Sequence, residues 1–406
     1  MLRQELHFLD AALRVEDPES RGRLLAGHHL IRAACAFAEG RSLQEASLAA
    51  WRMSADVFEG EPKWAAHLQA LEMALVSGDH PAVYAALTCF GTLLFIDGLG
   101  QSALAVFALA ERLRDARCPP DVVLDAFYVN AKLLLDGGAP AAATAALPFR
   151  MATMARHSAA PRHFAHARAL QVDRLATVGD LPRAGHAAER LLRFAQRSAA
   201  PHLVELAHLR CAVVHGRARR FALALAHATE AYRVPEQERA LLESTLLIMG
   251  RVLLDLGHVS RARETTELAL LHSRRRNRVL VLGTLIDIAL VEGSNARARQ
   301  LLVLARNEPP SGVTSHTYLT QMEACIETLA GNFLTARKLL EEGLAITRAA
   351  GHGYEFMEVD QELDRIAQLE ARAASATPLD SRVHEAVLSI SADHRRDAWR
   401  VQAVLA

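Results

Sequence analysis

A glycine followed five residues later by an alanine recurs at near-regular intervals along most of the chain. The six pairs are Gly98/Ala103, Gly138/Ala143, Gly179/Ala184, Gly257/Ala262, Gly293/Ala298 and Gly331/Ala336. Successive glycines in this set are 40, 41, 78, 36 and 38 residues apart. A period of this length indicates one supersecondary unit that stacks many times, so the chain is expected to form a repeat architecture.

The long step of 78 residues contains a weaker turn at Gly216, which divides it into 37 and 41 residues. The alanine position of this unit holds Phe221, so the sequence predicts an irregular repeat here. Each turn glycine lies between two apolar-periodic segments of about 13 to 18 residues, the pattern of a helical hairpin. Hydrophobic residues make up 51% of the chain and aromatic residues only 5%, which favours helices that pack through small side chains. We therefore predict an all-α chain of antiparallel helical hairpins.

The clearest unit covers residues 246–271. Its first helix carries the small residue Gly250, Gly257 makes the turn, and Ala262 and Ala269 lie seven residues apart on the second helix. Small residues at facing positions let two helices approach closely while leucines fill the surrounding core. The same spacing recurs around Gly98.

This pattern of a small residue, a turn glycine seven residues later and alanines five and twelve residues beyond resembles the tetratricopeptide repeat. The period here is longer than the family's value of about 34 residues, and leucine or alanine replaces most of its bulky aromatics. Longer repeats of this kind are similar to the helical arm of maltose-regulator-type bacterial transcription activators. The resemblance covers roughly residues 80–351 and implies a right-handed superhelical solenoid.

The predicted organisation has five parts. They are atypical N-terminal helices at 1–79, about seven repeat units at 80–351, a capping helix at 352–374, a linker at 375–380 and a C-terminal helical tail at 381–406. Prolines are expected to separate helices at Pro119-Pro120, Pro161, Pro201 and Pro309-Pro310. The short spacing between Gly78 and Gly98 indicates an unpaired helix or a lost half-repeat near the start of the array.

Several features bear on location. The longest apolar runs, such as residues 279–286, are shorter than the roughly 18 to 20 residues of a membrane span. The opening residues carry early charges and no apolar core segment, unlike a secretory signal. The five cysteines are scattered, odd in number and without CxxC spacing, which fits reduced thiols. We expect a cytoplasmic protein that does not contact the membrane.

Two clusters of polar residues suggest chemistry beyond packing. Glu205, His208, Cys211 and His215 fall on neighbouring faces of one helix and could converge on a metal. Because one helix rarely supplies a complete metal site, we favour half-buried polar side chains and expect no metal or cofactor. The arginine run at 274–278 could grip phosphate, but solvated arginines at a helix C-terminus are the preferred interpretation, so we do not expect nucleic-acid binding.

Alignment of the first helices by their turn glycines gives a row of polar positions that usually face the concave groove of tetratricopeptide proteins. The predicted partner-binding residues, which we call the polar row, are Asp125, Tyr128, Lys132, His166, Asp173, Arg210, Ser244, Arg251, Asp287, Tyr318 and Gln321. Such a row could hold an extended peptide or a helix. The competing interpretation is a ladder of internal ion pairs between neighbouring repeats.

The chain lacks the sequence motifs of phosphate loops, nucleophile elbows and zinc helices, so we predict no enzymatic activity and no catalytic residues. The first functional hypothesis is a scaffold that binds a protein or peptide in the groove. The second is a regulator, related to the sensor arm of bacterial transcription activators, that responds to a small molecule or peptide. It would lack the ATPase and DNA-binding modules that such activators carry.

Overall fold

The computed structural model describes residues 2–15, 18–40, 45–53, 62–198, 200–235, 241–273, 275–308 and 312–375. The described residues form helices and turns, and no β-strand occurs among them, which confirms the all-α prediction. Contacts within the chain define two compact units. Unit 1 contains Met1–Leu134 and Arg150–Phe164, and unit 2 contains Leu135–Phe149 and Ala165–Ala406.

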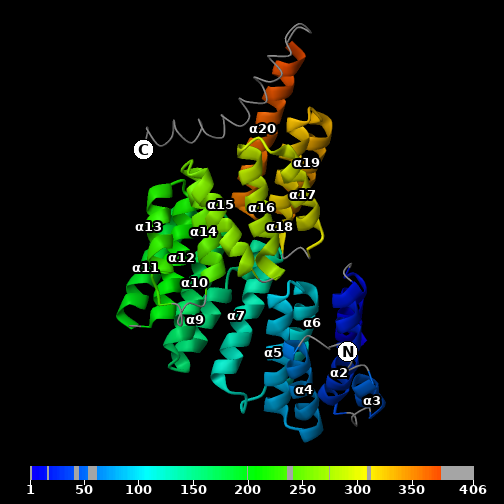
Figure 1. The fold of residues 1–406 in the computed structure, drawn as a ribbon. Helices are drawn as coiled ribbons and strands as arrows, with labels where there is room; N and C mark the ends of the chain where they lie inside the picture. The colour runs from blue at the N-terminus through cyan, green and yellow to red at the C-terminus, as the bar shows by residue number, and fades with distance from the viewer. Residues whose placement is uncertain are drawn as a thin grey trace. The chain divides into compact units, whose positions relative to one another are not determined.

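The helices that lie wholly or mostly in unit 1 come from the first part of the chain (Figure 1). They are α1 (Leu2–Leu13), α2 (Pro18–Ala38), α3 (Glu45–Met53), α4 (Pro62–Ser77), α5 (His80–Ile96), α6 (Gly100–Leu113), α7 (Pro120–Asp136) and α9 (Leu147–His157). Helices α1–α4 lie within residues 1–79, where the sequence predicts atypical N-terminal helices.

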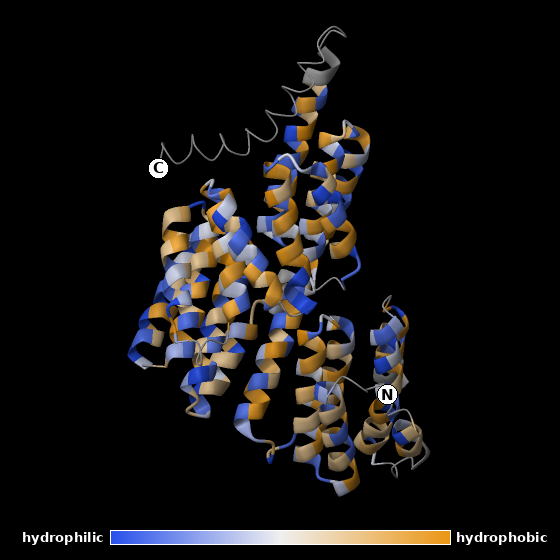
Figure 2. Cartoon of the chain, viewed as in Figure 1, coloured by the Kyte–Doolittle hydropathy of each residue, from blue (hydrophilic) through white to orange (hydrophobic). Residues whose placement is uncertain are grey.

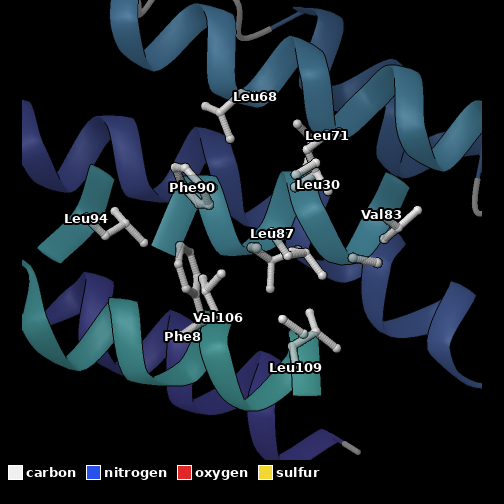
Figure 3. Close-up of a cluster of buried hydrophobic side chains, with 14 of the residues drawn as sticks. Phe8, Leu30, Leu68, Leu71, Val83, Leu87, Phe90, Leu94, Val106 and Leu109 are labelled. Atoms are coloured by element: carbon white, nitrogen blue, oxygen red, sulfur yellow. The ribbon is translucent and has the colours of Figure 1, made fainter. Parts of the chain in front are cut away.

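One continuous core holds unit 1 together. Aromatic and aliphatic side chains from α1, α2 and α4–α6 converge in this core, as Figure 3 shows around Phe8 and Phe90. Trp64 also lies in the core, where its Nε1 donates a hydrogen bond to Asp97 Oδ2 at 2.6 Å. Because α1 packs on both α2 and α6, the N-terminal helices complete this core.

The remaining helices form the array of unit 2. They are α8 (Ala141–Thr144), α10 (Pro161–Thr177), α11 (Leu181–Ser198), α12 (Pro201–Arg217), α13 (Phe221–Tyr232), α14 (Leu242–Asp255), α15 (Val259–Leu271), α16 (Arg275–Val291), α17 (Asn295–Arg306), α18 (Val313–Leu329), α19 (Phe333–Ala350) and α20 (Gly353–Ser375). Sequential helices pack as hairpins, with α12 on α13, α14 on α15, α16 on α17 and α18 on α19. Hydrophobic and hydrophilic residues mix along these helices, as amphipathic packing requires (Figure 2).

Local sequence signals account for the hairpins. Pro120, Pro161 and Pro201 each lie in the first turn of a helix, as predicted, while Pro309 and Pro310 fall outside the described residues. All six predicted turn glycines adopt positive φ, between 71° and 86°, a conformation that glycine reaches without strain. At the close approach of α14 and α15, a Cβ added to Gly250 would lie 2.3 Å from Thr266 Oγ1, which confirms the predicted tight contact there.

The predicted turn at Gly216 was wrong. Gly216 lies inside α12, and the left-handed turn residue is Arg219, with φ of 57°. Five residues later stands Ala224, which is fully buried like the equivalent alanines of the other regular units. The repeat is therefore regular at this point. Its regular spacing was missed because the turn residue is an arginine and not a glycine. The irregular unit follows Gly138 instead, where Ala143 is exposed and α8 spans only four residues.

Helix α20 packs on the last hairpin. Its buried Val359 and Ile366 join Ala324 of α18 and Leu340 of α19 in one apolar cluster. This helix corresponds to the capping helix predicted at 352–374. The predicted linker after Ser375 and the predicted tail at 381–406 lie outside the described residues. Among the described helices, none combines the length and the apolar character that a membrane crossing needs.

Candidate functional site

The polar row comes from the first helix of successive hairpins. Unit 1 carries its first three residues on α7, and unit 2 carries the other eight on α10, α12, α14, α16 and α18. Ten of these side chains are half-buried, and Tyr318 is buried. Partial burial of polar groups at equivalent positions gives each helix a polar stripe beside its apolar core face.

In unit 1, Asp125 organises the part of the polar row that lies on α7. Its Oδ1 accepts hydrogen bonds from Arg162 Nη2 at 3.2 Å and from His163 Nε2 at 3.1 Å. His163 is buried whereas Asp125 is half-exposed, so the carboxylate links a core side chain to the surface. Tyr128 and Lys132 lie half-buried farther along the same helix.

In unit 2, Arg210 and Asp173 form an ion pair between α12 and α10. Arg210 Nε lies 2.7 Å from Asp173 Oδ1, and Arg210 Nη2 donates to Asp173 Oδ2 at 3.1 Å. The two side chains are only 12% and 16% exposed. This two-point contact is the kind of internal pairing that the competing interpretation of the polar row anticipated. Arg210 is also out of register with Arg251, because Val213 stands six residues before the turn at Arg219.

Three predicted residues meet on consecutive first helices farther along unit 2. The guanidinium of Arg251 on α14 lies 4.4 Å from the ring centre of Tyr318 on α18. Tyr318 in turn donates its hydroxyl to Asp287 Oδ2 on α16 at 3.0 Å. A guanidinium over an aromatic face is attracted by the ring's electron density, so the three side chains hold one another in place. His166, Ser244 and Gln321 are half-buried elsewhere along the row.

A carboxylate that the sequence analysis missed lies close to this cluster. Burial raises the pKa of Asp255 to about 7; the nearby Arg251 opposes the rise, and the neighbouring Asp287 and Glu358 add to it. The neutral form of Asp255 is therefore more favoured than that of an aspartate in water. The repeat pattern offered no signal for Asp255, since it stands two residues before the turn glycine and outside the polar row.

Helix α20 brings further charged groups to the same face of unit 2. Arg217 Nη2 at the end of α12 donates to Glu355 Oε1 at 2.8 Å, and its guanidinium lies 4.4 Å from the ring centre of Tyr354. The hydroxyl of Tyr354 donates to Glu358 Oε1 at 2.7 Å. The sequence held one indication of this contact: residues 150–230 carry 13 arginines against 5 acidic residues, and the segment of α20 is acidic.

The four residues of the suggested metal site face different surroundings. Glu205 is fully buried and accepts the backbone N–H of Leu241 at 3.0 Å, and Cys211 lies in an apolar cluster of α10–α12. Burial raises the pKa of the Cys211 thiol to about 12, which disfavours the thiolate that a metal would need. In the part of the chain that the structure describes, no group of three or more potential ligands could hold a metal ion.

The two histidines of that set meet a third histidine on α13. Nδ1 of His208 lies 3.0 Å from Nδ1 of His227, and the ring of His215 stacks on His227 with 5.4 Å between centres. Burial is the largest influence that lowers the pKa of all three imidazoles, and charge on His227 further lowers those of His208 and His215. The neutral forms are therefore favoured, and one ring of the 3.0 Å pair donates to the other.

The arginine run at 274–278 does not lie at the kind of helix end that the sequence predicted. Residues from Arg275 onward begin α16, so they lie at a helix N-terminus and not at a C-terminus as expected. Ion pairs compensate them there: Arg276 pairs with Asp136, and Arg278 Nε lies 2.8 Å from Glu308 Oε1. Arg274 lies outside the described residues.

Unit 1 also contains an open pocket of about 530 Å³ between the α6–α7 connection and α9. Its lining includes Val123, Leu124 and Met154, with Arg114 and His157 at polar positions. None of the polar-row residues lines it, so the pocket and the predicted partner-binding residues are separate features of the molecule.

No known protein family matches the chain, and no curated protein matches its sequence. Two solved structures are similar to it at low sequence identity. The apo form of RapI aligns over 87% of this chain and 90% of its own length, with a TM-score of 0.43 and 10% identity. A tetratricopeptide repeat protein from Parabacteroides merdae aligns over 84% of this chain and 99% of its own, with a TM-score of 0.36 and 13% identity. The packing of hairpins in sequence gives the described part of the chain an all-α architecture of successive helical hairpins.

Proposed function

We propose that the chain is a non-enzymatic scaffold that binds a protein or peptide along the polar row of unit 2. The observation that carries this proposal is the cluster of Arg251, Asp287 and Tyr318, contributed by three consecutive repeats. Aromatic and arginine side chains are the types that dominate binding energy at interfaces. Their mutual contacts fix their orientation, which reduces the entropy lost when a partner binds.

The polar row can recognise both chemical features of a peptide. Arg251 can donate hydrogen bonds to carbonyl and carboxylate oxygens, whereas Asp287 can accept from backbone N–H groups. The hydroxyl of Tyr318 is used inside the cluster, where it holds Asp287 in place. The ion pair between Asp173 and Arg210 supports the row from inside the array. We place this activity in the cytoplasm, where the five free cysteines would remain reduced.

In the test, the full chain first captures a partner from a lysate of its native organism. The purified partner is then titrated against the chain to measure a dissociation constant. Arg251→Met keeps the aliphatic stem against Tyr318 and removes the charge, and we expect it to weaken binding about tenfold or more. Arg297→Met is the matched control, because Arg297 forms an exposed ion pair with Glu267 between α17 and α15. Equal dissociation constants for the Arg251 variant and the unchanged chain would contradict the proposal.

A second candidate is a regulator that responds to a small molecule or peptide, related to the sensor arm of maltose-regulator-type activators. The contact between Glu355 on α20 and Arg217 on α12 favours it, because a ligand that separates two distant repeats could change the curvature of the array. Thermal-shift screening with metabolites and short peptides tests this candidate. A ligand that raises the melting temperature of unit 2 without a protein partner would support it over the scaffold.

A further inference from the structure

Unit 2 contains a contact between its first and last repeats. The end of α7 and the turns that follow α7, α10 and α12 meet the segments that begin α16, α18 and α20. The bonded residues are 138 to 217 positions apart in sequence. We call this contact the closure seam. It joins residues 135–138, 178–179 and 217–219 on one side to Arg276 and residues 312–314 and 350–361 on the other.

Glycines bring the two backbones of the closure seam together. A Cβ added to Gly312 would lie 2.3 Å from the carbonyl oxygen of Asp136, and one added to Gly353 would lie 2.6 Å from that of Val178. Contacts this short leave no room for any side chain at either glycine. The first and last repeats are therefore in direct backbone contact.

Polar side chains hold the closure seam shut. Arg217 pairs with Glu355, and Thr314 Oγ1 donates to the same Glu355 Oε1 at 3.2 Å. His352 Nε2 donates to the carbonyl oxygen of Leu135 at 3.1 Å. Arg276 of α16 adds an ion pair with Asp136. Charge-assisted bonds of this kind are strong when formed, and they are replaced by water when the surfaces separate.

The closure seam differs from the contacts between neighbouring hairpins. The apolar clusters of α10–α12, α14–α16, α16–α18 and α18–α20 each join helices that follow one another in sequence. At the closure seam, Arg217 Nη1, His352 Nδ1 and Glu355 Oε2 are buried without a hydrogen bond within the described chain, and the last two lie 3.7 Å apart. Buried polar atoms without a hydrogen bond also occur within the array, at Thr245 and Thr317, so it is the polar character of the seam that distinguishes it. Buried polar atoms that lack a hydrogen bond destabilise the closed state, because water would satisfy them in an open one.

We infer that the closure seam is a reversible latch that controls how far unit 2 opens along its polar row. The neighbouring-hairpin clusters stay intact when the latch opens, so the array changes curvature without unfolding. We expect this polar seam to separate before the apolar clusters that join neighbouring hairpins, because water can replace its hydrogen bonds. The idea that the latch regulates partner access rests on the proposed function. The opening of the latch can nevertheless be measured without a partner.

Hydrogen exchange on the full chain tests the latch. In the unchanged protein, amides of residues 312–316 and 350–356 are expected to exchange at least tenfold faster than those at the centre of α14. Asp136→Arg and Arg276→Asp each place two like charges at the closure seam, and each is expected to accelerate the seam amides a further tenfold. The double variant Asp136→Arg/Arg276→Asp restores opposite charges and is expected to restore the slower exchange.

Glu267→Arg is the matched control, since it reverses a charge in the exposed pair with Arg297 away from the closure seam. It is expected to leave the seam amides unchanged. Three results would overturn the latch. The seam amides could exchange hydrogen no faster than the amides of α14, the single variants could leave the exchange rate of the seam amides unchanged, or the double variant could fail to restore the slower rate. None of these results involves a partner, so the partner titration succeeds or fails independently.

Discussion

Unit 1 and unit 2 differ in the size of the side chains that fill their cores. The aromatic side chains that are fully buried among the described residues, Phe8, Trp64, Tyr84 and Phe90, belong to unit 1. In unit 2, the buried positions five residues after the turns are alanines. These are Ala184, Ala224, Ala262, Ala298 and Ala336, all fully buried.

The difference predicts two kinds of stability. A single cluster joins α1–α7 in unit 1, so removal of one large side chain disturbs most of the unit. Unit 2 is held by a series of smaller clusters between successive hairpins, so its stability approximates a sum of neighbouring contacts. Damage in unit 2 should therefore remain near the altered repeat.

The largest expected effect comes from Phe90→Ala. Loss of this fully buried ring should destabilise unit 1 by about 3–5 kcal/mol, because the cavity lies at the centre of its one cluster. Trp51 and Trp64 report unfolding of unit 1 by fluorescence in a Trp399→Phe background. The matched change in unit 2 is Leu340→Ala, whose faster hydrogen exchange should be confined to α18–α20. Exchange that spreads through α10–α16 would break the comparison.

Gly250→Ala tests the alanine-based packing of unit 2 with a smaller effect. The new methyl group would clash with Thr266 Oγ1, which should cost about 1–3 kcal/mol in chemical unfolding. Thr266→Ala in the same chain removes that oxygen, so the double variant should lose less stability than the two single variants together. Gly185→Ala is the control, since the nearest atom to its new Cβ is Val214 Cγ1 at 4.0 Å.

Much of the hairpin architecture could be predicted because it depends on local signals. Turn glycines, buried alanines and helix-initiating prolines recur at fixed spacing, and each acts within one repeat. The turn at Arg219 was missed, because a residue other than glycine adopts the left-handed conformation there. The nearby Gly216 was taken as the turn instead, which shifted the alignment of this repeat by three residues. The buried Ala224 was the signal that could have restored the register.

The contacts of α20 could not be predicted in the same way. Whether Glu355 reaches Arg217 depends on the curvature that accumulates over the intervening repeats. Small differences in the packing of each hairpin set that curvature, and the period alone does not encode it. The polar row was predictable as a set of positions, but the partner of each side chain, such as Tyr318 for Arg251, depends on the stagger between adjacent helices.

A third prediction concerns the strained turn of unit 2. Arg219→Gly should stabilise the α12–α13 hairpin by about 0.5–1 kcal/mol, because glycine adopts positive φ without the steric cost that arginine bears. The lost hydrogen bond to Gln361, at 3.3 Å between exposed side chains, offsets little of this gain. Ala218→Gly is the neighbouring control and should destabilise, since Ala218 has a negative φ of −80°. A destabilised Arg219 variant would show that the contact with α20 outweighs the strain.

The smallest expected effect is a pH dependence of the same hairpin, which has no counterpart in the aromatic core of unit 1. His208, His215 and His227 all have lowered pKa values, chiefly through burial, so the folded hairpin binds fewer protons than the unfolded chain. Their contribution to stability is complete above the ordinary histidine pKa of about 6.5 and declines as the pH falls through the lowered values. Unfolding by urea should therefore require less denaturant at about pH 5.5 than at about pH 7.5.

His227→Gln should reduce this pH dependence most, because His227 contacts both other rings and its charge lowers their pKa values. His186→Gln is the matched control on α11, where the exposed ring hydrogen-bonds only to the nearby backbone oxygen of Pro182 among the contacts described. If the His227 variant retains the full pH dependence, the three-histidine contact does not govern acid sensitivity. The packing of α12 on α13 would then rest on apolar side chains, among them the buried Ala224 and Ala228.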